Sequence, residues 1–358
     1  MDVKPVIKLK GRGALSNPPA RYESCAHADI DDGWSPEDPE PPALCTTVTV
    51  DAARSVITRN QSPDVPFDQS INPYRGCEHG CVYCFARPTH AYLGLSPGLD
   101  FESRLFAKPD AAERLREELR KPGYVCRPIA LGTNTDPYQP VEREWRITRR
   151  ILEVLAECGH PLSIVTKSAL VERDVDLLAP MAAAGLVEVF VSVTTLDHGL
   201  ARRLEPRATA PRRRVETLRA LSRAGIPAGA LFAPVIPALN DAEMEAVLEA
   251  CAEAGARWAG YVLLRLPLEV KDLFQEWLRT HAPLKAAHVM SLLRAARGGK
   301  EYDPRFGARM TGTGVYADAL RRRFELACRR LRLNKSRHGL DTSRFRPPAR
   351  GGDQMSLW

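Results

Sequence analysis

The pattern of hydrophobic and polar positions between residues 66 and 267 alternates between two kinds of segment. Short apolar runs are typical of buried strands, and amphipathic segments with a helical period follow them after a Gly or Pro. Strands are predicted over residues 127–132, 162–166, 187–194, 228–235 and 260–266. Helices are predicted over residues 111–120, 141–158, 172–184, 212–224 and 241–254. One more strand is expected before Cys77.

This alternation gives about six β/α units, fewer than a closed TIM-type barrel contains. Successive crossovers of the same right hand bring such strands into one parallel sheet, which curls toward a barrel. The predicted fold class is therefore α/β, with a partial (β/α)6 TIM-type barrel that stays open on one side.

The two regions that flank the barrel differ from it in charge. Residues 21–50 contain seven acidic residues, one basic residue and four prolines, which predicts an irregular, solvated segment. Residues 319–350 contain eleven basic and two acidic residues. The predicted division is an irregular N-terminal arm over 1–65, the barrel over 66–267, a helical basic extension over 268–343 and a flexible tail over 344–358.

Composition narrows the class of protein. With 358 residues, 44% hydrophobic residues and a net charge of +7, the chain buries a large core, which excludes wholesale disorder. Nine cysteines are too few for a secreted disulfide scaffold, and the first residues lack the apolar core of a signal peptide. The apolar stretch 177–196 contains Pro180, Gly185 and Glu188, so a helix end and a strand are predicted there instead of a membrane span. A soluble, cytoplasmic protein is expected.

Three closely spaced cysteines are the strongest chemical signal. Cys77, Cys81 and Cys84 stand in the loop segment CEHGCVYC, directly after the first predicted strand. Thiolates that converge outside a disulfide context favour a soft metal centre, either zinc or iron–sulfur. Zinc would need a fourth ligand such as His79 or His90, and this segment lacks the paired CxxC half-sites of most structural zinc sites. An iron–sulfur cluster held by three cysteines leaves one iron open to a small molecule.

The spacing CxxxCxYC after the first strand of a partial barrel resembles the motif of the radical S-adenosylmethionine (SAM) superfamily. The resemblance implies that Cys77, Cys81 and Cys84 hold a 4Fe-4S cluster whose open iron binds the amine and carboxylate of SAM. It also implies that the backbone of Tyr83 lies near the adenine. Reductive cleavage of SAM would give a 5′-deoxyadenosyl radical that abstracts hydrogen from a substrate, with an electron donor of flavodoxin or ferredoxin type.

Polar residues follow the next predicted strands, where SAM would need partners. Asn134, Thr135 and Asp136 come after the second strand. Asp136 is a candidate for the ammonium group of SAM, and the other two are candidates for hydrogen bonds to it. Lys167, after the third strand, would pair with the methionine carboxylate, because an unpaired lysine at a barrel mouth is costly. Each residue has a plain alternative as a helix cap or as one partner of a surface ion pair.

The fourth predicted strand adds two more candidates. Ser192 lies near its end and suits a ribose hydroxyl, and Arg207 in the segment LEPR offers a second contact to carboxylate or ribose. Together with TNTDPYQPVE and VTKS, these segments resemble the superfamily group that includes spore photoproduct lyase and is commonly labelled DNA-repair photolyase-like. The resemblance covers about residues 66–267, and it extends to the whole chain for a bacterial subfamily with GRGA near its start, as at residues 11–14.

The chain departs from the lyase pattern at one place. Residues 133–135 are Thr-Asn-Thr, where the lyase pattern has a hydrogen-donating cysteine. Repair of the spore lesion itself is therefore not expected. The hydrogen donor stays open, with Cys126, Tyr138 and Tyr261 as candidates.

Two features outside the barrel suggest partners. The basic stretch YADALRRRFELACRRLRLN has an apolar face, so it packs on the protein. Its arginines suit nucleic acid, an acidic electron donor or plain solvent exposure. The last five residues resemble the short peptides that bacterial replication and repair proteins insert into the sliding clamp: Gln354, Met355, Ser356, Leu357 and Trp358.

The interpretation that follows is a radical SAM enzyme that acts on nucleic acid, such as DNA. One alternative makes a protein or a small metabolite the substrate, with the basic face docking the electron donor. Another alternative is a non-catalytic, zinc-binding nucleic-acid adaptor tethered to the sliding clamp. The identity of the metal would separate the adaptor from both enzymes. Loss of duplex binding at raised salt would favour the nucleic-acid substrate.

Overall fold

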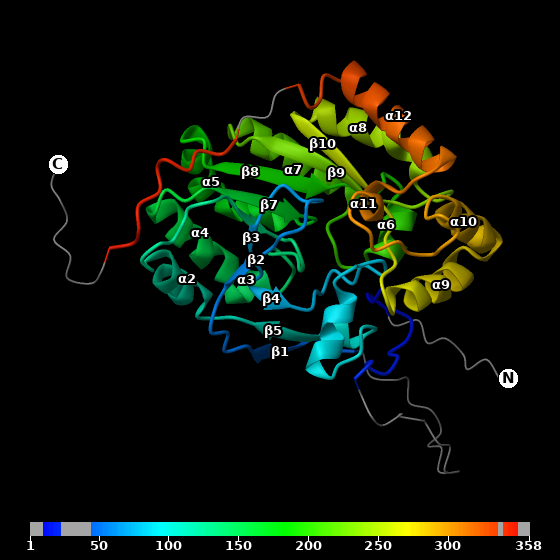
Figure 1. Cartoon of the computed structure of the whole chain (residues 1–358), viewed down its shortest axis with the longest axis horizontal. Coiled ribbons are helices and arrows are strands. Elements are labelled where there is room, and N and C mark those ends of the chain that lie inside the picture. The colour runs from blue at the N-terminus through cyan, green and yellow to red at the C-terminus, as the bar shows by residue number, and fades with distance from the viewer. Residues whose placement is uncertain (1–9, 23–43, 336–338, 350–358) are drawn as a thin grey trace, which may run out of the picture.

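A parallel sheet lies at the centre of the computed structural model, which describes residues 10–22, 44–335 and 339–349 (Figure 1). Six parallel strands lie side by side in chain order: β3 (Gln69–Ile71), β6 (Ile129–Leu131), β7 (Leu162–Thr166), β8 (Val187–Ser192), β9 (Ala228–Val235) and β10 (Trp258–Leu263). A short strand, β2 (Ile57–Arg59), pairs antiparallel with the outer side of β3. The α/β fold and the six parallel strands predicted from the sequence are confirmed.

Continuous apolar runs explain why these strands are central. Every residue of β8 is buried, and β7 and β9 are mostly buried. Strands of a parallel sheet are covered on both faces, so their sequences do not alternate between apolar and polar. Helices connect the strands and cover the sheet: α2 (Ala111–Leu119), α4 (Ile147–Glu157), α5 (Val175–Ala183), α7 (Pro211–Arg223) and α8 (Met244–Glu253).

The predicted helix over 141–158 is two helices in the structure, α3 (Glu142–Trp145) and α4. Arg146 stands between them with φ of 49°, in the left-handed region. The cause is the buried carboxylate of Glu142, which accepts a hydrogen bond from the Thr148 backbone N–H at 3.0 Å. Glu142 therefore caps the first turn of α4 from outside that helix.

Two other predicted elements have different ends. The helix predicted over 172–184 is a 3₁₀ helix, η2 (Ala169–Asp174), followed directly by α5. The last strand is β10 (Trp258–Leu263), two residues earlier at its start than the predicted range 260–266.

A second sheet of three strands lies beside the barrel, with the order β1 (Thr47–Val50), β5 (Arg104–Ala107) and β4 (Tyr74–Arg75). Both β1 and β2 belong to the stretch 1–65, so the prediction of a wholly irregular arm is wrong. The physical reason is pairing, because β1 forms a parallel ladder with β5, which lies far away in the sequence. Most of the acidic stretch lies outside the described residues.

The C-terminal extension is helical, as predicted, with α9 (Val270–His281), α10 (Pro283–Ala295), α11 (Ala308–Thr311) and α12 (Val315–Arg330). The helix α12 packs on α8, and Figure 1 shows the two helices side by side. Arg323 of α12 forms two hydrogen bonds with the carboxylate of Glu245 at 2.8 and 2.6 Å. Among the described residues, no helix is both long enough and apolar enough to cross a membrane.

Residues 339–349 form a strap across the amino ends of the strands (Figure 1). Asp341 donates its backbone N–H to the Gly185 carbonyl at 3.0 Å, and Arg346 donates its own to the Cys158 carbonyl at 2.9 Å. The ring of Phe345 lies 5.2 Å from that of His160. Residues 344–349 thus pack on the protein, in contrast to the flexible tail predicted for 344–358.

Candidate functional site

The cysteine loop, residues 77–84, lies between β4 and the 3₁₀ helix η1 (Arg87–Leu93). Cys77 and Cys81 are buried, and Cys84 is half-buried. The loop turns twice, because Gly80 donates its N–H to the Cys77 carbonyl at 3.3 Å and Cys84 donates its own to the Cys81 carbonyl at 3.2 Å. Gly80 has φ of 65°, a conformation that favours glycine. The three thiols are thereby held on one short, wrapped segment.

Burial decides which group these thiols can hold. Removal from water raises the pKa of Cys77, Cys81 and Cys84. The pKa of Cys77 is raised further by the charge of Asp136 and by those of the other two cysteines. As thiolates they therefore need a positive partner such as iron. Within the described residues, no three His, Cys, Asp or Glu side chains converge tightly enough to ligate one ion. Three cysteine thiolates suit the soft metal of an iron–sulfur cluster, whereas a structural zinc ion takes four protein ligands.

Lys167 provides a cation beside the cysteine loop. It follows β7, and its Nζ lies 5.9 Å from the centre of the Tyr83 ring. Its charge also acts on Cys81 and Cys84, against the increase in thiol pKa that burial causes. Its ammonium forms no hydrogen bond or ion pair with any residue in the part of the chain that the structure describes. A half-buried lysine without such a partner is available to an anionic ligand.

Tyr83 is held by a buried ion pair that the sequence analysis missed. Its hydroxyl donates to Glu205, and Glu205 also accepts from the Thr194 hydroxyl at 2.6 Å. Arg214 of α7 pairs with the same carboxylate and donates to the Ser192 carbonyl at 3.1 Å. A signal for Arg214 existed, because the helical period places it on the buried face of α7.

Asp136 joins the ends of β6 and β7. One of its carboxylate oxygens accepts from the Thr166 hydroxyl and the other from the Lys167 backbone N–H, both at 2.7 Å. His79 Nδ1 lies 3.4 Å from the second oxygen. Burial alone would raise the pKa of Asp136, but His79 and these hydrogen bonds lower it to about 2. Both oxygens of Asp136 accept hydrogen bonds from the protein, so this carboxylate connects the ends of β6 and β7 with His79 of the cysteine loop. Its role toward an ammonium group stays a prediction.

Asn134 and Thr135 are tied to the start of the cysteine loop through Asn72, another residue that the sequence analysis missed. The Asn72 side-chain oxygen accepts from the Asn134 N–H at 3.0 Å and from the Thr135 N–H at 3.4 Å. The Thr135 hydroxyl donates to the Tyr74 carbonyl at 3.0 Å. The end of β6 and the segment that leads to Cys77 are therefore one connected unit.

Ser192 belongs to β8, and Arg207 belongs to the segment between β8 and α7. Ser192 ends β8 and is buried, and its carbonyl accepts from Arg214. Arg207 contacts the cysteine loop directly, because its guanidinium lies 3.0 Å from the Glu78 carboxylate and its N–H donates to the His79 carbonyl at 3.3 Å. The structure thus brings Lys167, Asp136 and Arg207 to the cysteine loop.

The three candidate hydrogen donors lie in different parts of the fold. Cys126 precedes β6, at the amino ends of the strands, whereas the cysteine loop lies at the carboxyl ends. Tyr261 packs on Phe324 of α12, with the ring centres 4.8 Å apart. Tyr138 is fully buried, with the Arg173 guanidinium 5.9 Å from its ring centre. None of these placements supports a role toward a substrate.

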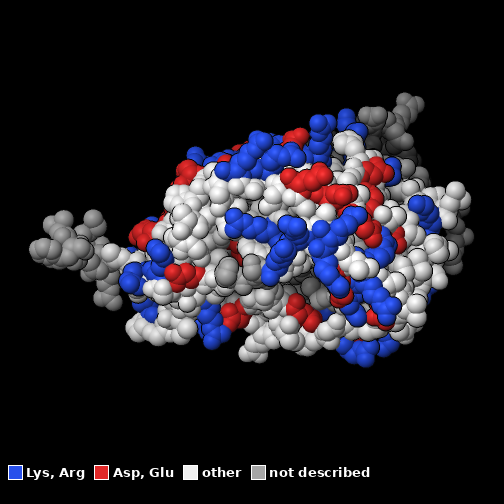
Figure 2. Space-filling view, turned by 90° about the horizontal axis from the view of Figure 1, so that it is seen from above, with Lys and Arg blue, Asp and Glu red and all other residues white. Residues whose placement is uncertain are grey.

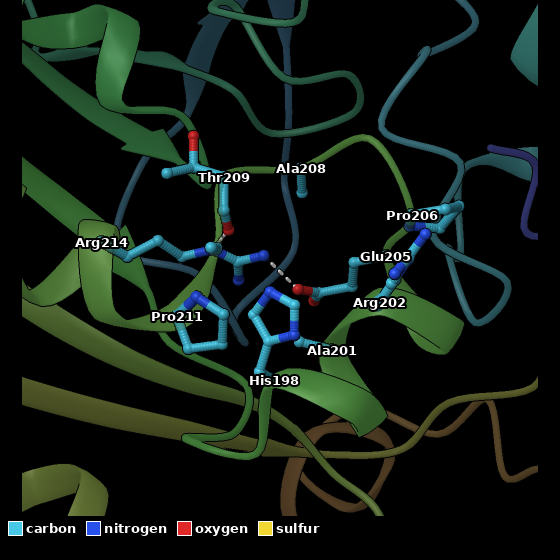
Figure 3. A pocket seen from close by; sticks show the side chains of 10 residues that line it. His198, Ala201, Arg202, Glu205, Pro206, Ala208, Thr209, Pro211 and Arg214 are labelled. Carbon is cyan, nitrogen blue, oxygen red and sulfur yellow. Dashed lines mark hydrogen bonds and ion pairs between the residues drawn. The ribbon is translucent and has the colours of Figure 1, made fainter.

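A cavity of about 350 Å³ lies between α6 (His198–Leu204) and the start of α7 (Figure 3). His198, Arg202, Glu205, Thr209 and Arg214 are its polar lining residues. Figure 3 shows the Glu205–Arg214 pair at its wall. Because Glu205 also accepts the hydrogen bond from Tyr83, the cavity and the cysteine loop share this side chain.

The basic C-terminal stretch is partly neutralised. Arg321 pairs with Asp318 at 3.0 Å, and Arg330 lies 3.8 Å from Glu249 of α8, in addition to the Arg323–Glu245 pair. In the view from above, Lys and Arg form several groups with Asp and Glu between them (Figure 2). The net positive charge counted along residues 319–350 is therefore larger than the net charge that the surface of α12 presents. The peptide predicted to bind the sliding clamp, residues 354–358, lies outside the described residues.

Comparisons with known proteins agree with this geometry. The family described as the Radical SAM superfamily matches residues 71–251. The protein Rv2578c of Mycobacterium tuberculosis is 40% identical over 232 residues, which cover 64% of this chain and 68% of that protein. The protein MJ0683 of Methanocaldococcus jannaschii is 29% identical over 173 residues, 48% of this chain and 62% of that protein.

Among solved structures, spore photoproduct lyase complexed with dinucleoside spore photoproduct has a similar fold. The TM-score is 0.50 at 15% sequence identity, and the match covers 79% of this chain and 78% of that chain. A second structure of the lyase, with bound S-adenosylmethionine and the same dinucleoside, gives the same TM-score and identity. At this identity the likeness concerns the fold alone.

Proposed function

The chain belongs to the radical SAM superfamily, and on that premise we propose that it is a radical SAM enzyme that holds a 4Fe-4S cluster on Cys77, Cys81 and Cys84. The observation that carries the proposal is the pairing of two buried thiols and one half-buried thiol on one loop with the ammonium of Lys167 beside them, which forms no hydrogen bond or ion pair with another described residue. When bound, the cluster supplies the electron for reductive cleavage of SAM to a 5′-deoxyadenosyl radical. An external one-electron donor, of flavodoxin or ferredoxin type, is required.

The chain's own residues bind and orient the cofactor in this proposal. Lys167 pairs with the methionine carboxylate, and Tyr83, fixed by Glu205, keeps its backbone in place for the adenine. Arg207 and Ser192 flank the loop on the β8 side, toward the carboxylate or ribose. Asn134, Thr135 and Asp136 complete the set: the contacts support a bracing role, and direct contact with the ammonium group is the further part of the proposal.

Nucleic acid is the proposed substrate. Two observations support it: the similar fold of a lyase solved with a dinucleoside, and exposed arginines of α12, such as Arg322 and Arg329, that have no carboxylate partner among the described residues. Clustered arginines bind phosphates with a strong dependence on salt. An acidic electron donor on the same face is the second candidate, because its docking needs the same cluster of positive charge.

The test of the reaction class is metal and product analysis without oxygen. The purified protein is reconstituted, and iron, sulfide and zinc are measured; dithionite and SAM are then added and 5′-deoxyadenosine is followed. About four irons per chain and 5′-deoxyadenosine are expected from the unaltered protein. A triple Cys77→Ala, Cys81→Ala, Cys84→Ala variant should yield neither, whereas Cys251→Ala, in the buried face of α8, should behave as the unaltered protein. One zinc and no 5′-deoxyadenosine would overturn the proposal.

The test of the substrate is binding of duplex DNA followed by fluorescence anisotropy over a range of salt. A nucleic-acid substrate predicts that affinity falls steeply as salt rises and that an Arg322→Glu, Arg329→Glu variant binds more weakly. Binding of reduced flavodoxin that weakens in the same variant, without any duplex binding, would assign the face to the electron donor instead.

A further inference from the structure

Residues 11–14 (GRGA) lie directly on the cysteine loop, although more than sixty residues separate the two segments in the sequence. We propose that these residues, the N-terminal clamp, act with Glu102 and Arg87 to hold the cysteine loop in the conformation that accepts its cluster. In this proposal Glu102 is a positioning residue. The role of the cluster rests on the proposed function, whereas the hold on the loop does not.

Glu102 is the centre of the arrangement. It lies in α1 (Asp100–Ser103), and its side chain is fully buried. Its carboxylate accepts hydrogen bonds from the backbone N–H of Gly13 at 2.9 Å and of Ala14 at 2.8 Å. A buried carboxylate requires such donors, and here the N-terminal clamp supplies two of them. Arg12 adds a hydrogen bond to the Glu102 carbonyl at 2.7 Å.

Arg87 connects Glu102 to the cysteine loop. Its guanidinium is fully buried and pairs with the Glu102 carboxylate. The same guanidinium donates to the Cys81 carbonyl at 2.9 Å and to the Gly80 carbonyl at 3.2 Å. One rigid, planar group therefore fixes two consecutive peptide units of the loop, and with them the direction of the Cys81 side chain.

The two backbones approach so closely that only glycine fits. A Cβ on Gly13 would lie 1.8 Å from the Gly80 carbonyl oxygen, where no real Cβ contact occurs. A Cβ on Gly80 would lie 2.7 Å from a carboxylate oxygen of Glu102, and its φ is already 65°. The clamp, the loop and Glu102 are thus in mutual contact.

The clamp is also anchored at its far end. The Ser16 hydroxyl donates to the Glu276 carboxylate of α9 at 2.6 Å, and Arg21 pairs with Glu269 at 2.9 Å. The residues after GRGA therefore reach the C-terminal extension, which gives the chain next to the clamp a second point of attachment. These two contacts fix the position of the N-terminal clamp against the cysteine loop.

Gly13→Ala is the decisive variant, because its added methyl group pushes the clamp off Gly80 and lies outside the barrel core. Gly339→Ala is the matched control, since a Cβ there meets nothing within 4 Å. Hydrogen exchange is measured by mass spectrometry on residues 76–87 of the cluster-free protein. Iron release to a chelator and the electron paramagnetic resonance spectrum of the reduced cluster are measured on the reconstituted protein.

The clamp predicts faster exchange confined to residues 76–87 and 100–104 in Gly13→Ala. It also predicts iron release on the order of tenfold faster, because hydrogen bonds to a charged group are lost. The spectrum should change as well, and the control should match the unaltered protein. Glu102→Gln should reproduce these effects, with Glu102→Asp restoring part of the retention; if Glu102→Gln fails to fold, Gly13→Ala decides alone.

Hydrogen exchange in residues 76–87 of Gly13→Ala at the rate of the unaltered protein would overturn the proposed role of the N-terminal clamp. A lower unfolding midpoint with unchanged spectrum and iron release would overturn the positioning role and leave a structural one. A failure of the proposed function is distinct, because then the unaltered protein would bind no cluster, while the exchange comparison would still decide the clamp.

Discussion

The buried pair of Glu205 and Arg214 gives the sharpest prediction of stability. The side chains are 0% and 1% exposed, respectively. Arg214→Met would leave the Glu205 carboxylate buried without its cation and would remove the hydrogen bonds to the Ser192 and Thr209 carbonyls. Removal of one partner from such a pair costs about 3–5 kcal/mol in the free energy of unfolding. Glu205→Gln should cost a similar amount, because Arg214 would then lack its carboxylate.

The double variant Glu205→Gln, Arg214→Met should cost less than the sum of the two single variants, since no uncompensated charge is left. The expected difference is about 1–3 kcal/mol. Arg213→Met is the matched control in the same helix, because Arg213 and its partner Glu172 are 44% and 25% exposed. Exposed pairs contribute roughly 0–1 kcal/mol.

The assay is urea unfolding of the cluster-free protein, followed by far-UV circular dichroism. A cost below about 1 kcal/mol for both single variants would refute the reasoning, because it would mean that the pair behaves as an exposed one. Additivity within about 0.5 kcal/mol would refute it as well. In either case the pair could not be what fixes Tyr83.

Other predictions concern the cofactor and pH. Lys167→Met should weaken SAM binding by about 10- to 100-fold, because a hydrogen bond to a charged group contributes about 1.5–3 kcal/mol. The iron content should stay constant. An unchanged SAM affinity in calorimetry would remove Lys167 from the site. His160 is buried, and this burial lowers its pKa to about 4 from the usual 6.5. The folded protein therefore holds His160 in its neutral form. The contribution of His160 to the free energy of unfolding is fully present above pH 6.5 and is lost as the pH falls toward 4. A loss of about 2 kcal/mol between pH 7 and pH 5 is expected from 1.36 kcal/mol per unit. Urea unfolding of His160→Gln should show a smaller loss over the same interval, and an equal loss would exclude His160 as the cause.

The sequence allowed the six strands and the cysteine loop to be predicted, because both have local signals. Buried strands are continuous apolar runs, and the three cysteines stand within eight residues. The break at Arg146 could not be predicted, since it depends on the burial of Glu142 and not on a helix-breaking residue. Only the packed structure shows that this carboxylate caps α4.

The candidate site divides in the same way. Lys167 and Arg207 were predicted from their positions after strands, and both reach the cysteine loop. Glu102 and Arg87 were missed, because a buried ion pair between charged residues in irregular segments has no periodic signal. The short segment GRGA gives no hint of its contact with Gly80 either, since that contact joins residues far apart in the chain.

The strap has a consequence for the order in which the protein is completed. The strands are synthesised in the order β3 to β10. The strap contacts the chain in the reverse order: first Gly185 before β8, then Cys158 before β7, and last Arg120 before β6, through the carbonyl of Pro348. Residues 341–348 leave the ribosome after every strand of the barrel. A nascent chain thus exposes the aromatic surface of Tyr124 and His160 until synthesis has passed Phe345, and chaperones have access to it until then.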